Sequence, residues 1–198
     1  MNTHNEAIST TRQILISVRM VLTTMVICCG VYTLLILGIG QIFVPYTANG
    51  SLLSNEQGDI IGSALIAQAF TRPEYIWPRP SAPDYNASAT GGSNWSPTNP
   101  ALRERAIKIL DRMRVEEGTL LPADLVTASG SGMDPHITLR AAKSQAKRVA
   151  MARGLPVTKV LDLLGQHAER PGELFGTEPL VNVLLVNLAL DRVRTSHK

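Results

Sequence analysis

The chain has no charged residue between Arg19 and Glu56. The core of this charge-free run, Met20–Val44, consists mostly of Val, Leu, Ile, Met and Thr. A helix of about 20 apolar residues spans the ~30 Å hydrocarbon core of a bilayer, so the run predicts one transmembrane helix. A buried helix of a soluble protein is the weaker alternative, because such helices rarely stay free of charge for so long.

The run also lacks the marks of a cleaved signal peptide. Such peptides carry an apolar region of roughly 7–15 residues and a cleavage site of the Ala-x-Ala kind. Here the apolar run is longer, and residues 44–49 offer no such site. We therefore expect the helix to remain in the protein as a membrane anchor in the lipid bilayer.

Basic residues are missing on one side of the predicted helix. Arg12 and Arg19 precede it, whereas the next basic residue is Arg72. Lys and Arg close to a membrane helix gather on its cytoplasmic side. We expect residues 1–19 to be cytoplasmic, residues 20–44 to cross the membrane, and residues 45–198 to form one extracytoplasmic domain.

The predicted extracytoplasmic domain lacks cysteine, because Cys28 and Cys29 both lie inside the predicted helix. This excludes disulfides, cysteine-based zinc sites and thiol catalysis outside the membrane. Beyond residue 50 the charges are nearly balanced, with 17 Lys and Arg against 15 Asp and Glu. The balance gives no reason to expect a nucleic-acid partner.

Strand and helix signals follow one another in the rest of the chain. The apolar, β-branched start of Ile60–Ile66 predicts a short buried strand, with a helix through Ala64–Ala69 as the alternative. Residues 71–100 hold six of the twelve prolines and predict a long irregular segment, of the kind that is usually functional. Asn99-Pro100 caps a helix that Gly118 is expected to close.

Two further helices and a strand complete the expected order. Asp134-Pro135 predicts a helix that runs to Arg153, where Gly154 stops it. Residues 157–164 predict another helix. Leu180–Leu190 predicts a central strand, with a helix as the alternative. The predicted fold class is a single N-terminal transmembrane helix plus one α+β domain.

The sharpest local motif is the small-residue run Thr127–His136. If a helix begins after it, the backbone N–H groups and the helix dipole offer an anion site. The Gly-Lys-Ser/Thr of a phosphate-binding loop and the Gly-x-Ser-x-Gly of a serine hydrolase are both absent. The alternative is a tight turn with a good helix cap, which the pattern favours.

Three side chains of this run carry a second hypothesis. Ser131, Asp134 and His136 together suggest a membrane-tethered hydrolase, although their geometry is not fixed by sequence. Asp134 and His136 alone are too few ligands to predict a metal site.

On the membrane helix, Thr23, Gly30 and Gln41 fall close to one stripe, which favours packing against a partner helix.

Several uncommon strings occur in one order along nearly the whole chain. They are Gly50–Leu52, Gly62–Ile66, Arg79–Ala82, Gly91–Asn94, Thr98–Pro100, Val126–His136, Arg148–Ala150, Val181–Val183 and Asn187–Asp191. On these strings the chain resembles the C subunit of the Kdp potassium-transporting ATPase. Trp95 and Met133 stand where a smaller or branched apolar residue is expected.

The resemblance implies a bacterial inner-membrane complex with a channel-like potassium subunit and a P-type ATPase subunit as partners. It implies a non-catalytic accessory subunit that stabilises assembly and raises the pump's affinity for ATP. Because the implied complex lies in the inner membrane and residues 45–198 are expected outside the cytoplasm, the domain is expected in the periplasm. The chain agrees in having no Asp-Lys-Thr-Gly-Thr phosphorylation motif. The resemblance assigns no catalytic residue and no metal, and it links Gln145 to nucleotide. The expected topology places Gln145 on the other side of the membrane from cytoplasmic ATP, which disfavours a direct contact between them.

Overall fold

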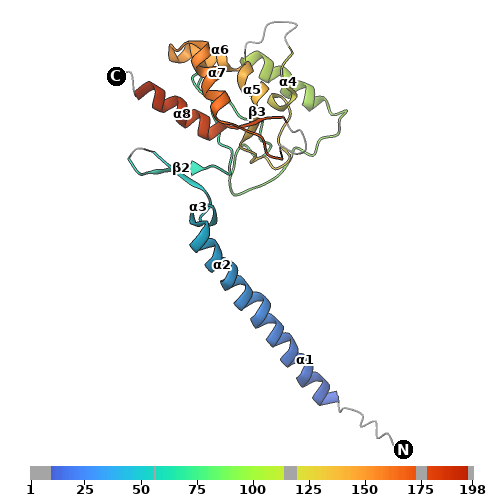
Figure 1. The fold of residues 1–198 in the computed structure, drawn as a ribbon. Helices are drawn as coiled ribbons and strands as arrows, with labels where there is room; N and C mark the ends of the chain where they lie inside the picture. Colours follow the sequence, from blue (N-terminus) through green and yellow to red (C-terminus); the bar gives the residue numbers. More distant parts are fainter. Residues whose placement is uncertain (1–9, 56, 114–119, 173–177, 196–198) are drawn as a thin grey trace, which may run out of the picture. The chain divides into compact units, whose positions relative to one another are not determined.

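The computed structural model describes residues 10–55, 57–113, 120–172 and 178–195. The chain divides into two compact units, Met1–Ser51 and Leu52–Lys198. Figure 1 shows a long helix in the first unit and several short helices with small sheets in the second. The expected fold class, a single spanning helix plus an α+β domain, is confirmed.

The first unit is dominated by one continuous helical segment. Helix α1 (Thr10–Met25) passes through a π-helical turn (Val26–Val31) into α2 (Tyr32–Phe43). The segment has 34 residues and is long and apolar enough to cross a membrane. At 1.5 Å per residue it measures about 50 Å, more than a ~30 Å hydrocarbon core requires. It begins ten residues before Met20, so Arg12 and Arg19 lie on the helix itself.

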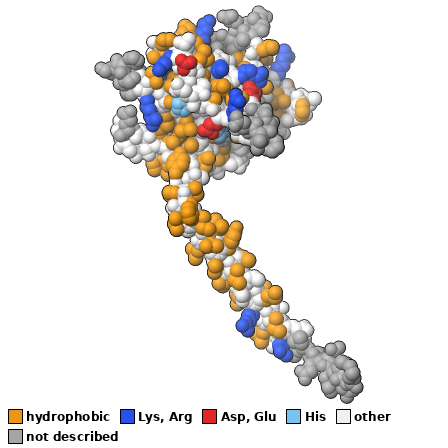
Figure 2. Space-filling view, viewed as in Figure 1, with side chains coloured by type: hydrophobic (Ala, Val, Ile, Leu, Met, Phe, Trp, Pro, Cys, Tyr) orange, Lys and Arg blue, Asp and Glu red, His pale blue; other side chains and the backbone are white. Residues whose placement is uncertain are grey.

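Hydrophobic side chains cover this helix, and its only Lys or Arg residues lie toward its N-terminal end (Figure 2). After Phe43 a short helix, α3 (Pro45–Ala48), ends the unit. The amides of Gln41 and Asn49 exchange two hydrogen bonds of 3.2 and 3.1 Å. Gln41, which we expected on a stripe facing a partner helix, is therefore hydrogen-bonded within its own unit.

The second unit begins with a two-stranded antiparallel hairpin of β1 (Leu52–Ser54) and β2 (Ile60–Ser63). The strand expected from Ile60 is present, but the expectation that it is buried was wrong at its start, since Ile60 is 65% exposed. A two-stranded ribbon has no third strand or helix to cover both of its faces. Apolar β-branched residues therefore indicated the strand without indicating its burial.

The expected irregular segment is confirmed: residues 71–99 form turns and loops without a helix or strand. Helix α4 (Pro100–Met113) then begins as expected, with the side-chain oxygen of Asn99 accepting from the N–H of Ala101 at 2.9 Å. Gly118, expected to close it, lies outside the described residues. Between α4 and the sheet lies a 3₁₀ turn, Ala123–Leu125.

A three-stranded antiparallel sheet has the order β3 (His136–Thr138), β5 (Leu180–Asn182), β4 (Ala168–Glu169). The expected central strand is thus correct for three residues only. From Val183 the chain is α8 (Val183–Thr195), and the side chain of Asn182 accepts from the N–H of Leu185 at 3.2 Å. The switch was hidden because the helix presents buried apolar residues on much of its surface, which removes a clear period.

The helix expected directly after Asp134-Pro135 was wrong in its start. These residues lead into β3, and α5 (Leu139–Ser144) begins later, capped by Thr138 with a 3.1 Å bond from the N–H of Ala141. Helix α6 (Ala146–Arg153) follows α5 after a break at Gln145 and ends at Gly154, whose φ of +66° is left-handed as expected. Loop Thr127–His136 therefore enters a strand. It forms a tight turn, the alternative that the sequence pattern favoured, and no helix N-terminus follows it directly to offer an anion site.

The core lies where α5, α6, α7 (Val157–Gln166) and α8 pack with the three-stranded sheet (Figure 1). Its largest buried apolar side chains come from α6, α7, α8, β3, β5, the 3₁₀ turn and the irregular segment: Ile76, Leu125, Ile137, Val149, Val160, Leu164, Val181, Val186 and Leu190. Helix α5 adds the smaller Ala141 and Ala142. Ile76 belongs to the irregular segment and is fully buried. The part of the irregular segment around Ile76 is therefore built into the core, whereas most of its other residues remain exposed or half-buried.

Candidate functional site

The loop Thr127–His136 is held by its own side chains. The hydroxyl groups of Ser129 and Ser131 lie 3.1 Å apart, and each also accepts from a backbone N–H further along the loop, of Gly132 and Met133 respectively. Gly132 has a φ of +69°, and a Cβ there would overlap Pro83. The two serines therefore shape the turn, and glycine is required at position 132, where the loop meets the irregular segment.

The irregular segment, residues 71–99, forms hydrogen bonds with this loop at several points along its length. The N–H of Ser129 donates to the carbonyl of Pro80 at 3.1 Å, and the hydroxyl of Ser81 donates to the carbonyl of Gly132 at 2.6 Å. The N–H of Gly91 donates to the carbonyl of Ser131 at 2.8 Å. These bonds satisfy backbone groups that have no ladder partner, as buried polar groups require.

Asp134 joins two basic side chains at one end of the loop. Its carboxylate lies 3.3 Å from the guanidinium of Arg79 and 3.4 Å from Nδ1 of His136, and it accepts from the N–H of His136 at 3.0 Å. The hydrogen bond from the His136 side chain, aided by its backbone N–H and by Arg79, lowers the pKa of the Asp134 carboxyl against the effect of burial. Asp134 is thus held as a carboxylate.

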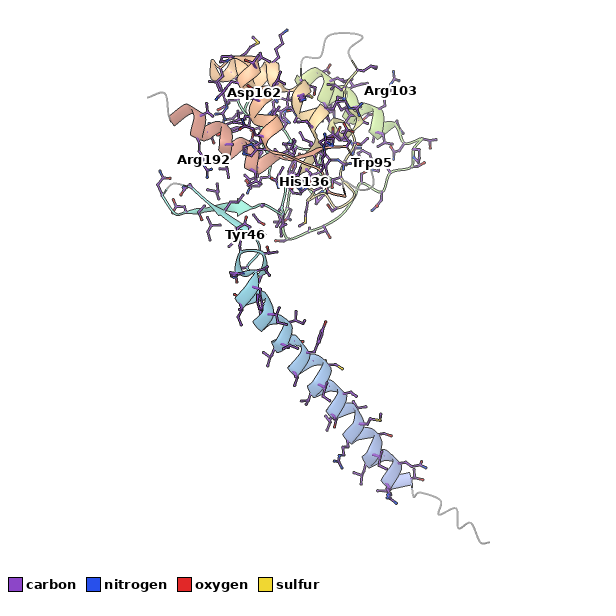
Figure 3. All side chains as sticks on the ribbon, in the orientation of Figure 1. Tyr46, Trp95, Arg103, His136, Asp162 and Arg192 are labelled. Carbon is purple, nitrogen blue, oxygen red and sulfur yellow. The ribbon has the colours of Figure 1, made fainter. Side chains whose placement is uncertain are left out.

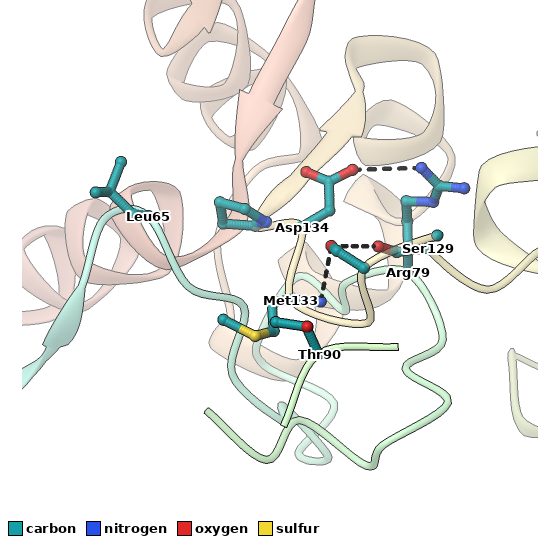
Figure 4. Close-up of a pocket in the computed structure, with 9 residues that line it drawn as sticks. Leu65, Arg79, Thr90, Ser129, Met133 and Asp134 are labelled. Carbon is teal, nitrogen blue, oxygen red and sulfur yellow. Dashed lines mark hydrogen bonds and ion pairs between the residues drawn. The ribbon is translucent and has the colours of Figure 1, made fainter. Parts of the chain in front are cut away.

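A cavity of about 570 Å³ lies over this loop (Figure 4). Ser129, Ser131 and Asp134 line it, together with Arg79, Leu65 and Thr90. The dashed contacts in Figure 4 join Asp134 to Arg79 and Ser131 to Ser129 and the backbone of Met133. The cavity therefore has a mixed wall, in which Leu65, Met133 and Pro135 lie beside polar groups that bond chiefly to one another.

Of the three hydrolase candidates, the structure pairs Asp134 with His136. Across the described chain, Ser131 has no hydrogen bond to His136, and its hydroxyl is engaged by the loop. Attack by serine needs a base within hydrogen-bond reach of its hydroxyl. The described residues also contain no group of three His, Cys, Asp or Glu side chains placed to hold a metal ion.

Gln145 lies between α5 and α6 and is 1% exposed. Its side-chain oxygen accepts from the N–H of Trp77 at 2.9 Å and from the guanidinium of Arg148 at 2.6 Å. Its side-chain nitrogen donates to the carbonyl of Trp77 at 3.0 Å. Both ends of the amide are thus engaged, and a direct contact with nucleotide requires one of these bonds to break.

Asn187 of α8 makes the same pair of bonds one residue earlier. Its oxygen accepts from the N–H of Ile76 at 2.8 Å, and its nitrogen donates to the carbonyl of Ile76 at 2.9 Å. Asn187 is 1% exposed. Two buried amides from different helices thus hold the backbone of Ile76–Trp77 as neighbouring strands would hold a strand.

Arg148 supports this arrangement from α6. Its guanidinium donates to the carbonyls of Pro73 at 2.6 Å and Tyr75 at 3.0 Å, and it lies 3.7 Å from the centre of the Trp77 ring. Burial, with a smaller effect from the Arg112 charge, lowers the pKa of the Arg148 guanidinium to about 10. Arg148 remains charged at neutral pH and fixes the segment around Trp77.

Sequence reasoning missed the partners of Gln145. Trp77 is one of several aromatic residues in the irregular segment, and Arg148 follows Lys143 and Lys147 in a basic stretch, so neither position by itself indicates a contact with Gln145. Asn187 stood inside an apolar run, and a buried amide there was the available signal, because such a group must find hydrogen bonds. The contacts themselves join residues 68 and 111 positions apart, which no local pattern reveals.

Comparison with known proteins bears on the whole chain. The family model described as "K+-transporting ATPase, c chain" matches residues 14–192. The chain belongs to the KdpC family.

Several curated relatives, each named as a potassium-transporting ATPase KdpC subunit, cover most of both chains. The protein from Parvibaculum lavamentivorans is 48% identical over 180 residues, which is 91% of this chain and 96% of the relative. That from Myxococcus xanthus is 46% identical over 90% of this chain and 87% of its own length. That from Synechocystis is 43% identical over 91% and 98%. The resemblance read from the sequence is confirmed.

Proposed function

We propose that this KdpC-family chain is a non-catalytic accessory subunit of an ATP-driven, high-affinity potassium-uptake complex. Its partners are a channel-like potassium subunit and a P-type ATPase subunit. The observation that carries the proposal is the family match over residues 14–192, which includes most of the spanning helix as well as the domain. An unrelated tethered enzyme has no reason to match a transport subunit over its anchor.

In this proposal the helix lies in a bacterial inner membrane, with the N-terminus cytoplasmic and the α+β domain periplasmic. Arg12 and Arg19 support this orientation, because both lie on α1, before the charge-free part of the segment. Protease added to cells stripped of their outer membrane tests it. A tag at the C-terminus should be lost, while a tag at the N-terminus should stay protected.

The subunit acts, in this proposal, by stabilising the assembled complex and by raising the affinity of the pump subunit for ATP. Direct nucleotide binding through Gln145 is the alternative route. The buried position of Gln145 and its bonds to Trp77 favour the indirect route. Equilibrium binding of a labelled ATP analogue to the full chain in detergent separates them. The indirect route predicts no saturable binding, and saturable binding lost in Gln145→Ala supports direct contact.

Growth at limiting potassium tests the function itself. Cells lacking their own KdpC-type subunit and other potassium uptake should grow at low potassium only when this chain is supplied with its partner subunits. A chain truncated to residues 52–198, without the anchor, is the matched control and should fail. Growth without any form of the chain would refute the proposal.

A further inference from the structure

A second cavity, of about 250 Å³, lies between helix α4 and the irregular segment. Trp77 and Tyr85 come from the segment, and Arg105 and Arg112 come from α4. Pro78 and Leu125 add apolar wall. We call the cavity and these residues the arginine socket.

Within the part of the chain that the structure describes, the two arginines of the socket bond to carbonyls and rings and to no acidic side chain. Arg112 lies 4.0 Å from the centre of the Trp77 ring and donates to the carbonyl of Phe70 at 3.2 Å. Arg105 lies 4.8 Å from the Trp95 ring and donates to the carbonyl of Val126 at 3.4 Å. Among the described residues, no carboxylate oxygen lies within 4 Å of either guanidinium, and none lines the socket.

Two other arginines of the same domain are paired with carboxylates. Arg79 is paired with Asp134 at 3.3 Å, and Arg153 is paired with Asp191 at 2.8 Å. A third cation, Arg148, lies 3.7 Å from the centre of the same Trp77 ring, and the Arg112 charge helps to lower the pKa of its guanidinium. Like charges that affect one another in this way raise the cost of leaving them unpaired. The socket is therefore a concentrated positive charge with donor capacity left over, which a carboxylate complements.

Size decides what kind of ligand fits. Sites for small molecules and cofactors usually have volumes of about 300–1,000 Å³. The socket is smaller, and it suits one side chain with its carboxylate. Trp, Tyr and Arg are also the residues that dominate binding energy where protein surfaces meet. An anchor side chain from another protein fits these observations better than a free cofactor.

We propose that the arginine socket receives an Asp or Glu side chain from an extracytoplasmic segment of another subunit of the complex. The carboxylate lies between the Arg105 and Arg112 guanidinium groups, and its methylene groups pack on Trp77 and the apolar wall. This inference rests on the proposed function, because it names the surface through which the accessory subunit contacts a partner.

The test is recovery of the partner subunits with the tagged full-length chain in mild detergent. Arg105→Glu/Arg112→Glu reverses the socket charges and should lower recovery at least tenfold. Arg103→Glu/Lys108→Glu makes the same change in charge at exposed positions of the same helix and should keep recovery within twofold (Figure 3 labels Arg103). Recovery of the partner subunits with the wild-type chain should also fall at about 1 M salt. At that concentration the Debye length is about 3 Å, so salt weakens the attraction between the arginines and a carboxylate.

Each outcome decides the inference. Equal recovery for the two double variants overturns it, while the proposed function stands as long as the wild-type chain brings its partners down. If no partner comes down with the wild-type chain, the proposed function fails first. If the reversed variant does not fold, judged by thermal unfolding of the purified chain, Arg105→Gln and Arg112→Gln are compared with Arg103→Gln instead, and equal recovery again overturns it.

A second arm separates a partner side chain from a free anion. In the Arg105→Glu/Arg112→Glu background, each periplasmic Asp or Glu of the partner subunits is replaced in turn by Arg. One replacement should restore recovery at least fivefold. Calorimetric binding of inorganic phosphate to the full-length chain should be undetectable at about millimolar concentration. Tight phosphate binding that depends on Arg105, with no rescuing replacement, would contradict the inference.

Discussion

The amide of Gln145 forms with the backbone of Trp77 the two hydrogen bonds that an adjacent β-strand would supply, at 2.9 and 3.0 Å. The relationship explains how a segment with half of the chain's prolines is built into the core. Proline removes backbone donors and disfavours a regular strand. Side chains from neighbouring helices then take over the satisfaction of the remaining backbone groups.

Replacing Gln145 by Leu should destabilise the domain by about 2–6 kcal/mol. The change leaves two backbone groups of Trp77 without partners, and each buried unsatisfied group costs about 1–3 kcal/mol. Thermal unfolding of the purified full-length chain measures it, with Lys147→Leu at a neighbouring exposed position as control. An unchanged unfolding temperature would show that the amide is not a structural clamp.

Replacing Asn187 by Leu should cost as much as Gln145→Leu or more. Ile76, whose backbone it holds, is fully buried, so no water can replace the lost bonds. The double variant should show coupling, because both amides fix consecutive residues of one segment. Denaturant unfolding of the two single variants and the double variant measures this. Strict additivity would argue that the two clamps act independently.

Replacing Gly132 by Ala should destabilise the loop at the first cavity. The residue has a left-handed φ of +69°, and an added Cβ would lie 2.8 Å from the carbonyl oxygen of Gly91 as well as overlapping Pro83. We expect a loss of about 2–3 kcal/mol from strain and displacement. Gly130→Ala is the control, because nothing lies within 4 Å of a Cβ there. Equal effects of the two changes would contradict the predicted difference.

Acid should destabilise the domain partly through Asp134. The bond from His136 lowers the pKa of this carboxyl below its ordinary value of 3.8, so the folded state binds a proton less readily than the unfolded state. The resulting stability is fully present above about pH 4 and is lost as pH falls through the folded pKa. Between about pH 5 and pH 2, the free energy of unfolding should fall less steeply with falling pH for Asp134→Asn than for the unmodified chain. Parallel slopes would contradict the assignment.

Replacing His136 by Ala should leave potassium-dependent growth in place. Among the described residues its side chain bonds to Asp134 and not to Ser131, so the account gives it a local structural part. The tethered-hydrolase hypothesis predicts instead that a hydrolytic turnover disappears while folding and assembly persist. Assay of the purified chain against ester and peptide substrates, before and after the change, distinguishes the two.

The spanning helix and the helix starts at Asn99-Pro100 and Pro156-Val157 could be predicted because each depends on local chemistry: absence of charge, a capping amide, a fixed φ. One other expected helix start, at Asp134-Pro135, was wrong. Asp134 accepts from the N–H two residues on, as a helix cap does, yet the chain continues into β3 because His136–Thr138 pairs with Leu180–Asn182. A partner strand more than 40 residues away in sequence decides that outcome.

The candidate site was less predictable still. Gln145 entered through the resemblance, and its sequence shows only a polar residue beside an apolar stripe. Its burial and its bonds to Trp77 depend on how α5 and α6 pack against the irregular segment. The arginine socket likewise joins α4 to residues 77–85, and no spacing in the chain announces it.

The most direct test of the central claim is purification of the tagged full-length chain from native membranes in mild detergent. The account predicts that two larger membrane proteins elute with it in fixed ratio, and that the mixture hydrolyses ATP in response to potassium. A chain that leaves the membrane alone, with no transport protein and no ATP hydrolysis beside it, would contradict the account.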